Sequence, residues 1–243
     1  MKQLNAGIFI LLACLAGCAT EDSSKVKQES IYTTYNANYD DENKSIYTSA
    51  FFNFGGSLGT YLRLDGNSTV TFNGETLDAE TTIINQVIYK YEKSHLSSDQ
   101  IWKTHSFLYR NNDGKEFKNE FTFPNLITVR YVAASIDTNS TLVANWNSSD
   151  KIGHDQLYLS IVSSDKTKNR RQGSEENTEN STSGKITVPQ NTISELGPGT
   201  FNVNICREHF GTGLNTPPEG GSLSATTCSK KTEITILNSI THN

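Results

Sequence analysis

Short runs of strand-forming residues, separated by turn residues at regular intervals, are the feature that most constrains the fold of this chain. β-branched and aromatic residues dominate runs such as 82–91, 101–109 and 156–162, as is typical of strands. Asn73-Gly74 separates two further runs and favours a type I′ turn, which predicts a hairpin. No segment of useful length repeats its apolar residues at the period of an amphipathic helix. The pattern therefore predicts an all-β protein with antiparallel strands.

The N-terminal residues have the layout of a secretory signal. Lys2 supplies a positive charge, residues 6–15 form an apolar run interrupted only by Gly7, and small residues precede Cys18. These are the charged end, apolar core and cleavage site of a signal peptide. An apolar run of about ten residues is half the length that a bilayer-spanning helix requires. A permanent transmembrane helix is therefore not expected.

Leu15-Ala16-Gly17-Cys18 resembles the lipobox of bacterial lipoproteins. The resemblance implies cleavage between Gly17 and Cys18, removal of residues 1–17, a diacylglycerol on the Cys18 thiol, and a further chain such as palmitate on the new amino terminus. Two or more acyl chains hold a protein firmly on a membrane. Ala19-Thr20 follows in place of the aspartate that resembles an inner-membrane retention signal, which favours the outer membrane. The alternative is an ordinary signal peptide with a chance cysteine.

The charge and cysteine content narrow the possible partners. The net charge is −5, which gives no basic surface for nucleic acid and no reason to adsorb on anionic lipid. Cys14 leaves with the signal and Cys18 is the lipid site, so Cys206 and Cys228 remain as an even pair. Export implies an oxidising compartment, which predicts a disulfide; closing this loop is worth roughly 3 kcal/mol. A metal site is the alternative, but His209 is the only further ligand nearby.

Composition divides the chain into an anchor, a tether and two domains. Residues 18–45 are polar, so they are expected to form the lipid anchor and a flexible tether. Two β-sandwich domains are expected to follow, at 46–123 and at 124–238. Residues 164–184 lose almost all apolar content and are therefore expected to form a disordered, exposed loop in the second domain.

Three segments in the second half carry a resemblance to a known family. They are Leu-Val-Ala-Asn-Trp at 142–146, Leu-Tyr-Leu-Ser-Ile at 157–161, and Leu-Gly-Pro-Gly-Thr-Phe at 196–201. Together they resemble a fibronectin type III or related immunoglobulin-like domain, which implies that Trp146 is a core residue of an early strand. The first half has no such landmark, and strand spacing alone predicts a β-sandwich. The expected fold is two immunoglobulin-like antiparallel β-sandwiches.

One motif resembles a catalytic site, and one row of aromatic residues resembles a sugar-binding face. Gly55-Gly56-Ser57-Leu58-Gly59 matches the Gly-x-Ser-x-Gly elbow of serine hydrolases, but the elbow requires a following helix and residues 60–64 resemble a strand. A glycine-rich turn is therefore expected. A row of rings on adjacent strands could bind sugars, although rings on strands more often pack in a core. These rings are Tyr89, Tyr91, Trp102, Phe107 and Tyr109.

The sequence thus predicts a membrane-anchored bacterial lipoprotein that is not an enzyme. The five histidines share no metal-ligand spacing, so neither a metal nor another cofactor is expected. The expected role is a non-catalytic binding or structural module of the cell envelope, with an envelope protein or a glycan as its partner. Fold alone does not settle this role. A surface-exposed adhesin or receptor is the alternative, followed by a serine hydrolase that uses Ser57.

Overall fold

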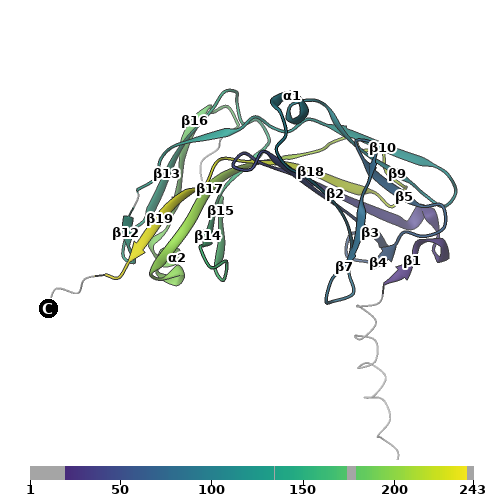
Figure 1. Ribbon diagram of the computed structural model, residues 1–243, viewed down its shortest axis with the longest axis horizontal. Helices are drawn as coiled ribbons and strands as arrows, with labels where there is room; N and C mark the ends of the chain where they lie inside the picture. The colour runs from purple at the N-terminus through teal and green to yellow at the C-terminus, as the bar shows by residue number, and fades with distance from the viewer. Residues whose placement is uncertain (1–19, 134, 174–178, 240–243) are drawn as a thin grey trace, which may run out of the picture.

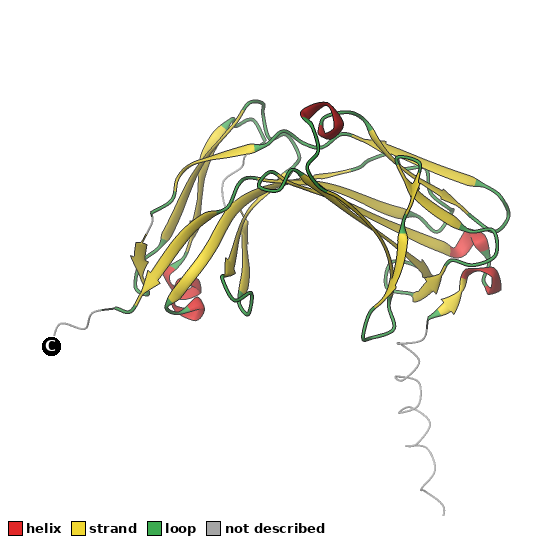
Figure 2. Cartoon of the chain, in the orientation of Figure 1, coloured by secondary structure: helices red, strands yellow, loops and turns green. Residues whose placement is uncertain are grey.

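The computed structural model describes residues 20–133, 135–173 and 179–239, and over these ranges the protein is all-β (Figures 1 and 2). One 12-stranded sheet runs through the whole molecule. Its main path is β1 (Glu21–Asp22), β4 (Thr60–Arg63), β3 (Ser45–Phe54), β2 (Ile31–Asp40), β18 (Gly221–Cys228), β17 (Gly199–Phe210), β14 (Gln156–Ser163) and β15 (Asn169–Gly173). Its branches are β7 (Asp78–Thr81), β8 (Val87–Lys93), β12 (Ser135–Asp137) and β19 (Thr232–Leu237).

Two smaller sheets pack on this large sheet. The first contains β10 (Glu116–Phe121), β9 (His105–Arg110), β5 (Thr69–Phe72) and β6 (Glu75–Thr76); the second contains β11 (Ile127–Tyr131), β13 (Leu142–Ser148) and β16 (Ser183–Val188). The helical elements are short: η2 (Ser23–Lys25), η3 (Gln28–Ser30), α1 (Ser98–Ile101) and α2 (Gln190–Leu196). No helix among the described residues is long and apolar enough to cross a bilayer.

Each small sheet encloses one hydrophobic core against the large sheet. The first core lies between residues 31 and 123 but also takes Leu223 and Ala225 from β18, and the second lies between residues 127 and 236. Trp146 is buried in the second core, as the family resemblance implies. The arrangement confirms the prediction of an all-β protein and is compatible with immunoglobulin-like sandwiches. Whether the chain divides into separate domains at 123–124 stays a prediction.

Both cores lie on the same side of the large sheet. Arg207 of β17 pairs directly with Thr227 of β18, so alternate residues of the two strands face the same way. Val203 on β17 belongs to the second core, while Ala225 on β18 belongs to the first, and both share this face. Figure 1 shows the result: the large sheet is arched, and the smaller sheets cover its outer side.

The tether predicted over residues 18–45 is wrong for most of its length. β2 lies inside the large sheet, antiparallel to β3 and parallel to β18. Its residues alternate between the core and the opposite face, and Ile31, Tyr35 and Tyr39 are almost completely buried. A ten-residue strand that buries one face in this way is a structural element of the first core. The signal peptide and the lipidation site at Cys18 lie outside the described residues.

Two other segments also differ from expectation. The predicted disordered loop at 164–184 contains β15, which is antiparallel to β14, and the start of β16; its residues 174–178 lie outside the described structure. Residues 82–86, predicted to be strand, form the turn of the β7–β8 hairpin. By contrast, the Asn73-Gly74 hairpin is confirmed, because both residues have positive φ between the paired strands β5 and β6.

The burial of β2 leads to a stability prediction. Tyr35→Ala should lower the free energy of unfolding by ~3–5 kcal/mol, because it removes a ring that stacks on Phe107 with centroids 4.8 Å apart. Asn38→Ala on the same strand is the control, since Asn38 is exposed and its loss should change stability by less than about 0.5 kcal/mol. Urea unfolding followed by tryptophan fluorescence measures both. Equal, small effects would contradict the placement of β2 in the core.

Candidate binding surface

The inner side of the arch is a broad sheet face that no other described layer covers (Figure 1). On β2 this concave face carries Tyr32, Thr34, Asn36 and Asn38, which alternate with the core residues. None of these four side chains is ionisable at neutral pH, and three are amides or hydroxyls of modest size. Neutral amides and hydroxyls such as these can hydrogen-bond a ligand at a lower desolvation cost than charged groups.

Hydrogen bonds between side chains run across three neighbouring strands of the concave face. The Asn36 amide donates to the Ser49 hydroxyl on β3, at 3.4 Å, and its oxygen accepts from the Ser224 hydroxyl on β18, at 3.0 Å. Thr34 and Ser222 are also in contact, with their hydroxyl oxygens 3.5 Å apart. These bonds hold the side chains in fixed positions, so the face offers preorganised donors and acceptors.

A recess of about 730 Å³ lies on the concave face, where β2, β3, β8 and β7 meet. This 730 Å³ recess is lined by Asn38, Tyr47, Thr48, Ser49, Asp78, Ala79, Glu80, Lys90, Tyr91 and Glu92. Tyr47 is 37% exposed, so its ring is accessible from the recess. Lys90 and Glu80 form an ion pair of 2.6 Å at the rim. The recess thus combines an accessible ring, hydroxyls and amides, and paired charges.

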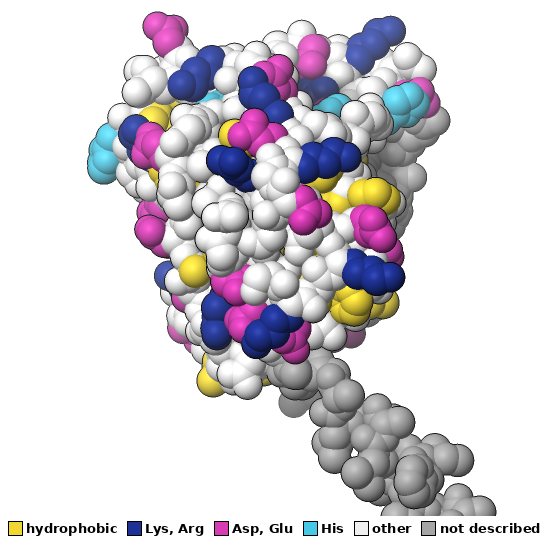
Figure 3. Space-filling model, turned by 90° about the vertical axis from the view of Figure 1, so that its right-hand side faces the viewer, with side chains coloured by type: hydrophobic (Ala, Val, Ile, Leu, Met, Phe, Trp, Pro, Cys, Tyr) yellow, Lys and Arg dark blue, Asp and Glu magenta, His cyan; other side chains and the backbone are white. Residues whose placement is uncertain are grey.

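The concave face continues into the second half of the chain. Arg171 on β15 lies over the Tyr158 ring on β14, with 4.4 Å between the guanidinium carbon and the ring centroid. Phe210, at the end of β17, is 44% exposed. Figure 3 shows the side of the molecule that lies on the right in Figure 1, where basic and acidic side chains are interspersed and hydrophobic ones are scattered among them. On the outer sheet, Lys118 and Glu120 of β10 form an ion pair.

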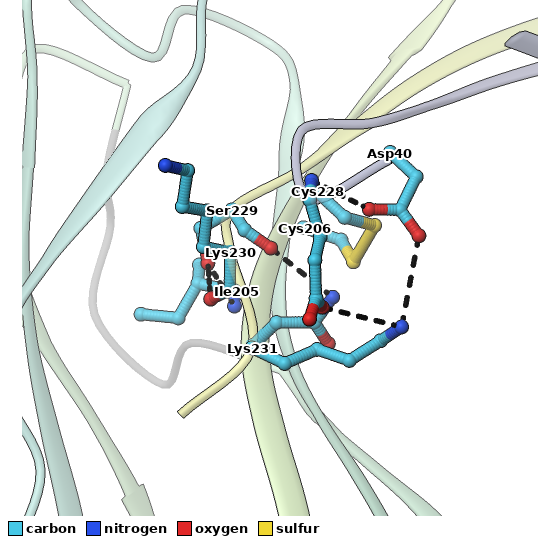
Figure 4. Close-up of a disulfide and its surroundings, with 9 residues drawn as sticks. Asp40, Ile205, Cys206, Cys228, Ser229, Lys230 and Lys231 are labelled. Carbon is cyan, nitrogen blue, oxygen red and sulfur yellow. Dashed lines mark hydrogen bonds and ion pairs between the residues drawn. A yellow bond between two sulfur atoms is a disulfide. The ribbon is translucent and has the colours of Figure 1, made fainter. Parts of the chain in front are cut away.

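The disulfide between Cys206 and Cys228 is formed, and it lies where the two halves of the large sheet meet (Figure 4). The two cysteines are direct partners in the register of β17 and β18. Beyond them β17 changes partner from β18 to β19. Ser229 bridges this change, because its backbone N–H donates to the Ile205 carbonyl and its hydroxyl accepts from the Ile205 N–H. The disulfide therefore fixes the strand junction at the middle of the arch.

Next to this junction lies a buried arginine. The Arg207 guanidinium donates to Asp155 at 2.6 Å, to Asp150 at 2.7 Å, and to the backbone carbonyls of Lys151 and Ile152. Burial alone would raise the pKa of Asp150, but the hydrogen bonds from Arg207 and Ser148 outweigh burial and hold that pKa below its usual range. Because the donors of Arg207 are taken up by the 148–155 loop, we assign this group a structural role in holding that loop on β17.

The catalytic motif forms a turn. Residues 55–59 connect β3 to β4, Gly55 and Gly56 have φ of 82° and 98°, and strand β4 follows in place of a helix. The strand-to-helix geometry that exposes an elbow serine is therefore absent from this part of the described chain. No group of three or more histidine, cysteine or acidic residues in the described ranges could hold a metal.

The aromatic row divides between core and surface. Tyr89, Phe107 and Tyr109 are buried in the first core, and Tyr91 is half-buried against it. Trp102 is 38% exposed and packs edge-to-face on Tyr39. The core interpretation is thus confirmed for most of the row. The accessible ring of the recess is Tyr47 on β3. Which face of β3 is exposed could be assigned only once its pairing with β2 and β8 was known.

No protein-family model matches the sequence, and no curated protein matches it significantly.

The position of the disulfide predicts its contribution to stability. Replacing both cysteines (Cys206→Ala with Cys228→Ala) should lower the free energy of unfolding by ~2–4 kcal/mol, because the cross-link closes a loop over a sequence separation of 22. Urea unfolding with and without reductant measures this loss. Reductant should weaken the wild type by a similar amount and leave the double variant unchanged; a wild type indifferent to reductant would contradict the prediction.

The buried His105 predicts a pH dependence of stability. Burial lowers the pKa of His105, although its hydrogen bond to the Ile101 carbonyl acts in the opposite direction. The unfolded chain therefore takes up a proton first, and the free energy of unfolding should fall as the pH drops below about 6.5. His105→Gln should flatten this dependence between pH 7 and pH 5. His154→Gln, at a histidine whose side chain is 93% exposed, is the control and should retain the wild-type slope.

Proposed function

We propose that the protein is a bacterial lipoprotein, anchored at the outer membrane through acylated Cys18, that acts as a non-catalytic binding module of the cell envelope. The resemblance of residues 15–18 to a lipobox supports the anchor. The observation that supports binding is the concave sheet face, with its preorganised hydroxyls and amides and its 730 Å³ recess. A recess of this size falls within the range of small-ligand sites.

A binding role is supported over a catalytic one by the groups that line the recess. They are hydroxyls and amides from β2 and β3, a tyrosine ring, and charged residues of which Lys90 and Glu80 are paired. A catalytic site needs a nucleophile or base whose pKa is shifted by burial or by a specific partner. The buried histidine His105, whose pKa is shifted, does not line the recess. It lies in the first core on β9, where it hydrogen-bonds Asn73 and the Ile101 carbonyl.

The chemistry of the face favours an envelope glycan or an envelope protein with a polar surface as the partner. Amide and hydroxyl side chains such as Asn36, Asn38 and Ser49 can donate to and accept from sugar hydroxyls or peptide groups. The exposed face of Tyr47 offers apolar contact area with a polar end. Both partner classes would use the same face, so one set of variants tests them together.

Large side chains placed in the recess should weaken binding to the envelope partner. The purified Cys18→Ser form is expected to cosediment with envelope fragments, and the pair Asn38→Arg with Ser49→Arg should weaken this binding by about tenfold or more, or ~1.4 kcal/mol. Lys118→Ala with Glu120→Ala, on the outer surface, is the control and should bind like the parent. Protease treatment of the fragments removes a protein partner, and periodate oxidation removes a glycan. Equal losses in both double variants, or no cosedimentation of the parent, would refute the proposal.

A further inference from the structure

Two isoleucines with exposed side chains, Ile83 and Ile84, occupy the turn of the β7–β8 hairpin. Ile83 is 104% exposed and Ile84 is 65% exposed, and neither belongs to either hydrophobic core. Turn positions usually hold Gly, Asn, Asp, Ser or Pro, which suit the backbone and are polar or small. Ile83 and Ile84 therefore leave apolar surface exposed to water. This surface does not contribute to either hydrophobic core.

The turn is nevertheless well formed. The Thr82 N–H donates to the Gln86 carbonyl, the Asn85 N–H donates to the Thr82 carbonyl, and the Gln86 N–H donates to the Thr82 hydroxyl. Asn85 adopts the left-handed conformation with φ of 59°, which this residue type tolerates well. The two isoleucines are therefore presented to solvent by an ordered turn.

This turn is in contact with the point where the chain leaves toward the predicted anchor. The Thr20 hydroxyl donates to the Asn85 carbonyl. Cys18 precedes Thr20 by two residues, and two residues of extended chain span at most about 7 Å. Acyl chains on Cys18 would thus enter the bilayer close to the hairpin turn. Figure 1 shows the β7–β8 hairpin projecting from the sheet on the same side of the molecule as β1, the first described strand.

A third exposed apolar side chain, that of Leu58, lies in the turn that follows β3. The 55–59 turn leads into β4, which pairs with β3 at Asn53 and Phe54 and with β1 at Glu21 and Asp22, directly after Thr20. Within this turn Leu58 is 98% exposed. We call Leu58, Ile83 and Ile84 the apolar tip.

The positions of the charged residues along the hairpin limit how far the apolar tip could enter a membrane. The sequence from 81 to 89 contains no ionisable acid or base apart from Tyr89, whose hydroxyl accepts from the Leu64 N–H. The first charged residues behind the turn are Glu80 and Lys90, which pair with each other. Ile83 follows Glu80 by three positions in the sequence, and three rises of extended chain span roughly 10 Å. That distance matches the depth to which interfacial apolar groups enter the boundary between headgroups and acyl chains.

We propose that the apolar tip inserts into the bilayer beside the acylated Cys18, so that the protein is held by its lipid and by Ile83, Ile84 and Leu58 in a fixed orientation. This inference rests on the proposed lipid anchor, which brings the membrane to this end of the molecule. A protein partner could also cover the tip. The contact between Thr20 and the hairpin turn favours the lipid surface, because the anchor brings it there without a further component.

The test uses the full-length acylated protein in vesicles of phosphatidylethanolamine and phosphatidylglycerol. Cys206 and Cys228 are bonded to each other and Cys18 would carry lipid, so Ile83→Cys provides a free thiol for an environment-sensitive nitrobenzoxadiazole label. We expect emission at shorter wavelength and loss of fluorescence when the lipids carry bromine on their acyl chains. The control label at Asp99→Cys, exposed on α1 at the opposite side of the arch, should show neither change. Adding Ile84→Asp should reduce the quenching at position 83.

Mass spectrometry of the same sample separates the two proposals. If Cys18 carries acyl chains and the label at position 83 is not quenched, the tip does not insert and this inference is wrong, while the lipid anchor stands. If Cys18 is unmodified, the anchor is wrong. The unacylated protein mixed with excess vesicles then tests the tip directly, because quenching at position 83 supports insertion and its absence overturns it.

Discussion

The parallel pairing of β2 with β18 is the contact on which the rest of the architecture depends. It joins segments about 188 residues apart, and closing a loop of that length costs about 5 kcal/mol in chain entropy. Two groups of contacts offset this cost: Leu223 and Ala225 complete the first core, and the Cys206–Cys228 bond ties β18 to β17. Because β18 supplies core residues to the first half while pairing with a strand of the second, neither half can complete its sheet alone.

This shared sheet also explains why one face stays open. Each small sheet covers the same side of the large one, and the core residues of β17 and β18 therefore alternate with residues that have no covering layer. A sheet face left open in a protein is usually solvated and polar. Here it is also ordered, because Asn36 links Ser49 to Ser224 across the strands. The fold thus yields a large open surface as a direct consequence of its topology, with ordered amides and hydroxyls on β2, β3 and β18 and charged residues around the recess.

The sequence predicted the elements whose signals are local. Strand runs, the Asn73-Gly74 hairpin and the cysteine pair depend on neighbouring residues or on simple counting, and all three are found. The tether prediction failed because the average composition of 18–45 hides an alternation: Ile31, Tyr35, Ala37 and Tyr39 face the core between polar residues. β15 carries no apolar signal, since backbone pairing with β14 and the Arg171–Tyr158 contact hold it. The recess could not be predicted, because it depends on strands β2, β3, β8 and β7 meeting in space.

The two proposed surfaces share a geometric consequence. The turn of the β7–β8 hairpin and β1, with which the described chain begins, lie on the same side of the arch as its concave face (Figure 1). A molecule held at the bilayer through Cys18 and the tip would therefore open its recess toward the lipid surface. A ligand in that recess would have to lie close to the membrane, which favours a membrane-attached glycan or the membrane-proximal part of an envelope protein over a freely diffusing molecule. The closeness of the recess to the membrane would then contribute to specificity, because it excludes bulky partners that match the recess in chemistry alone.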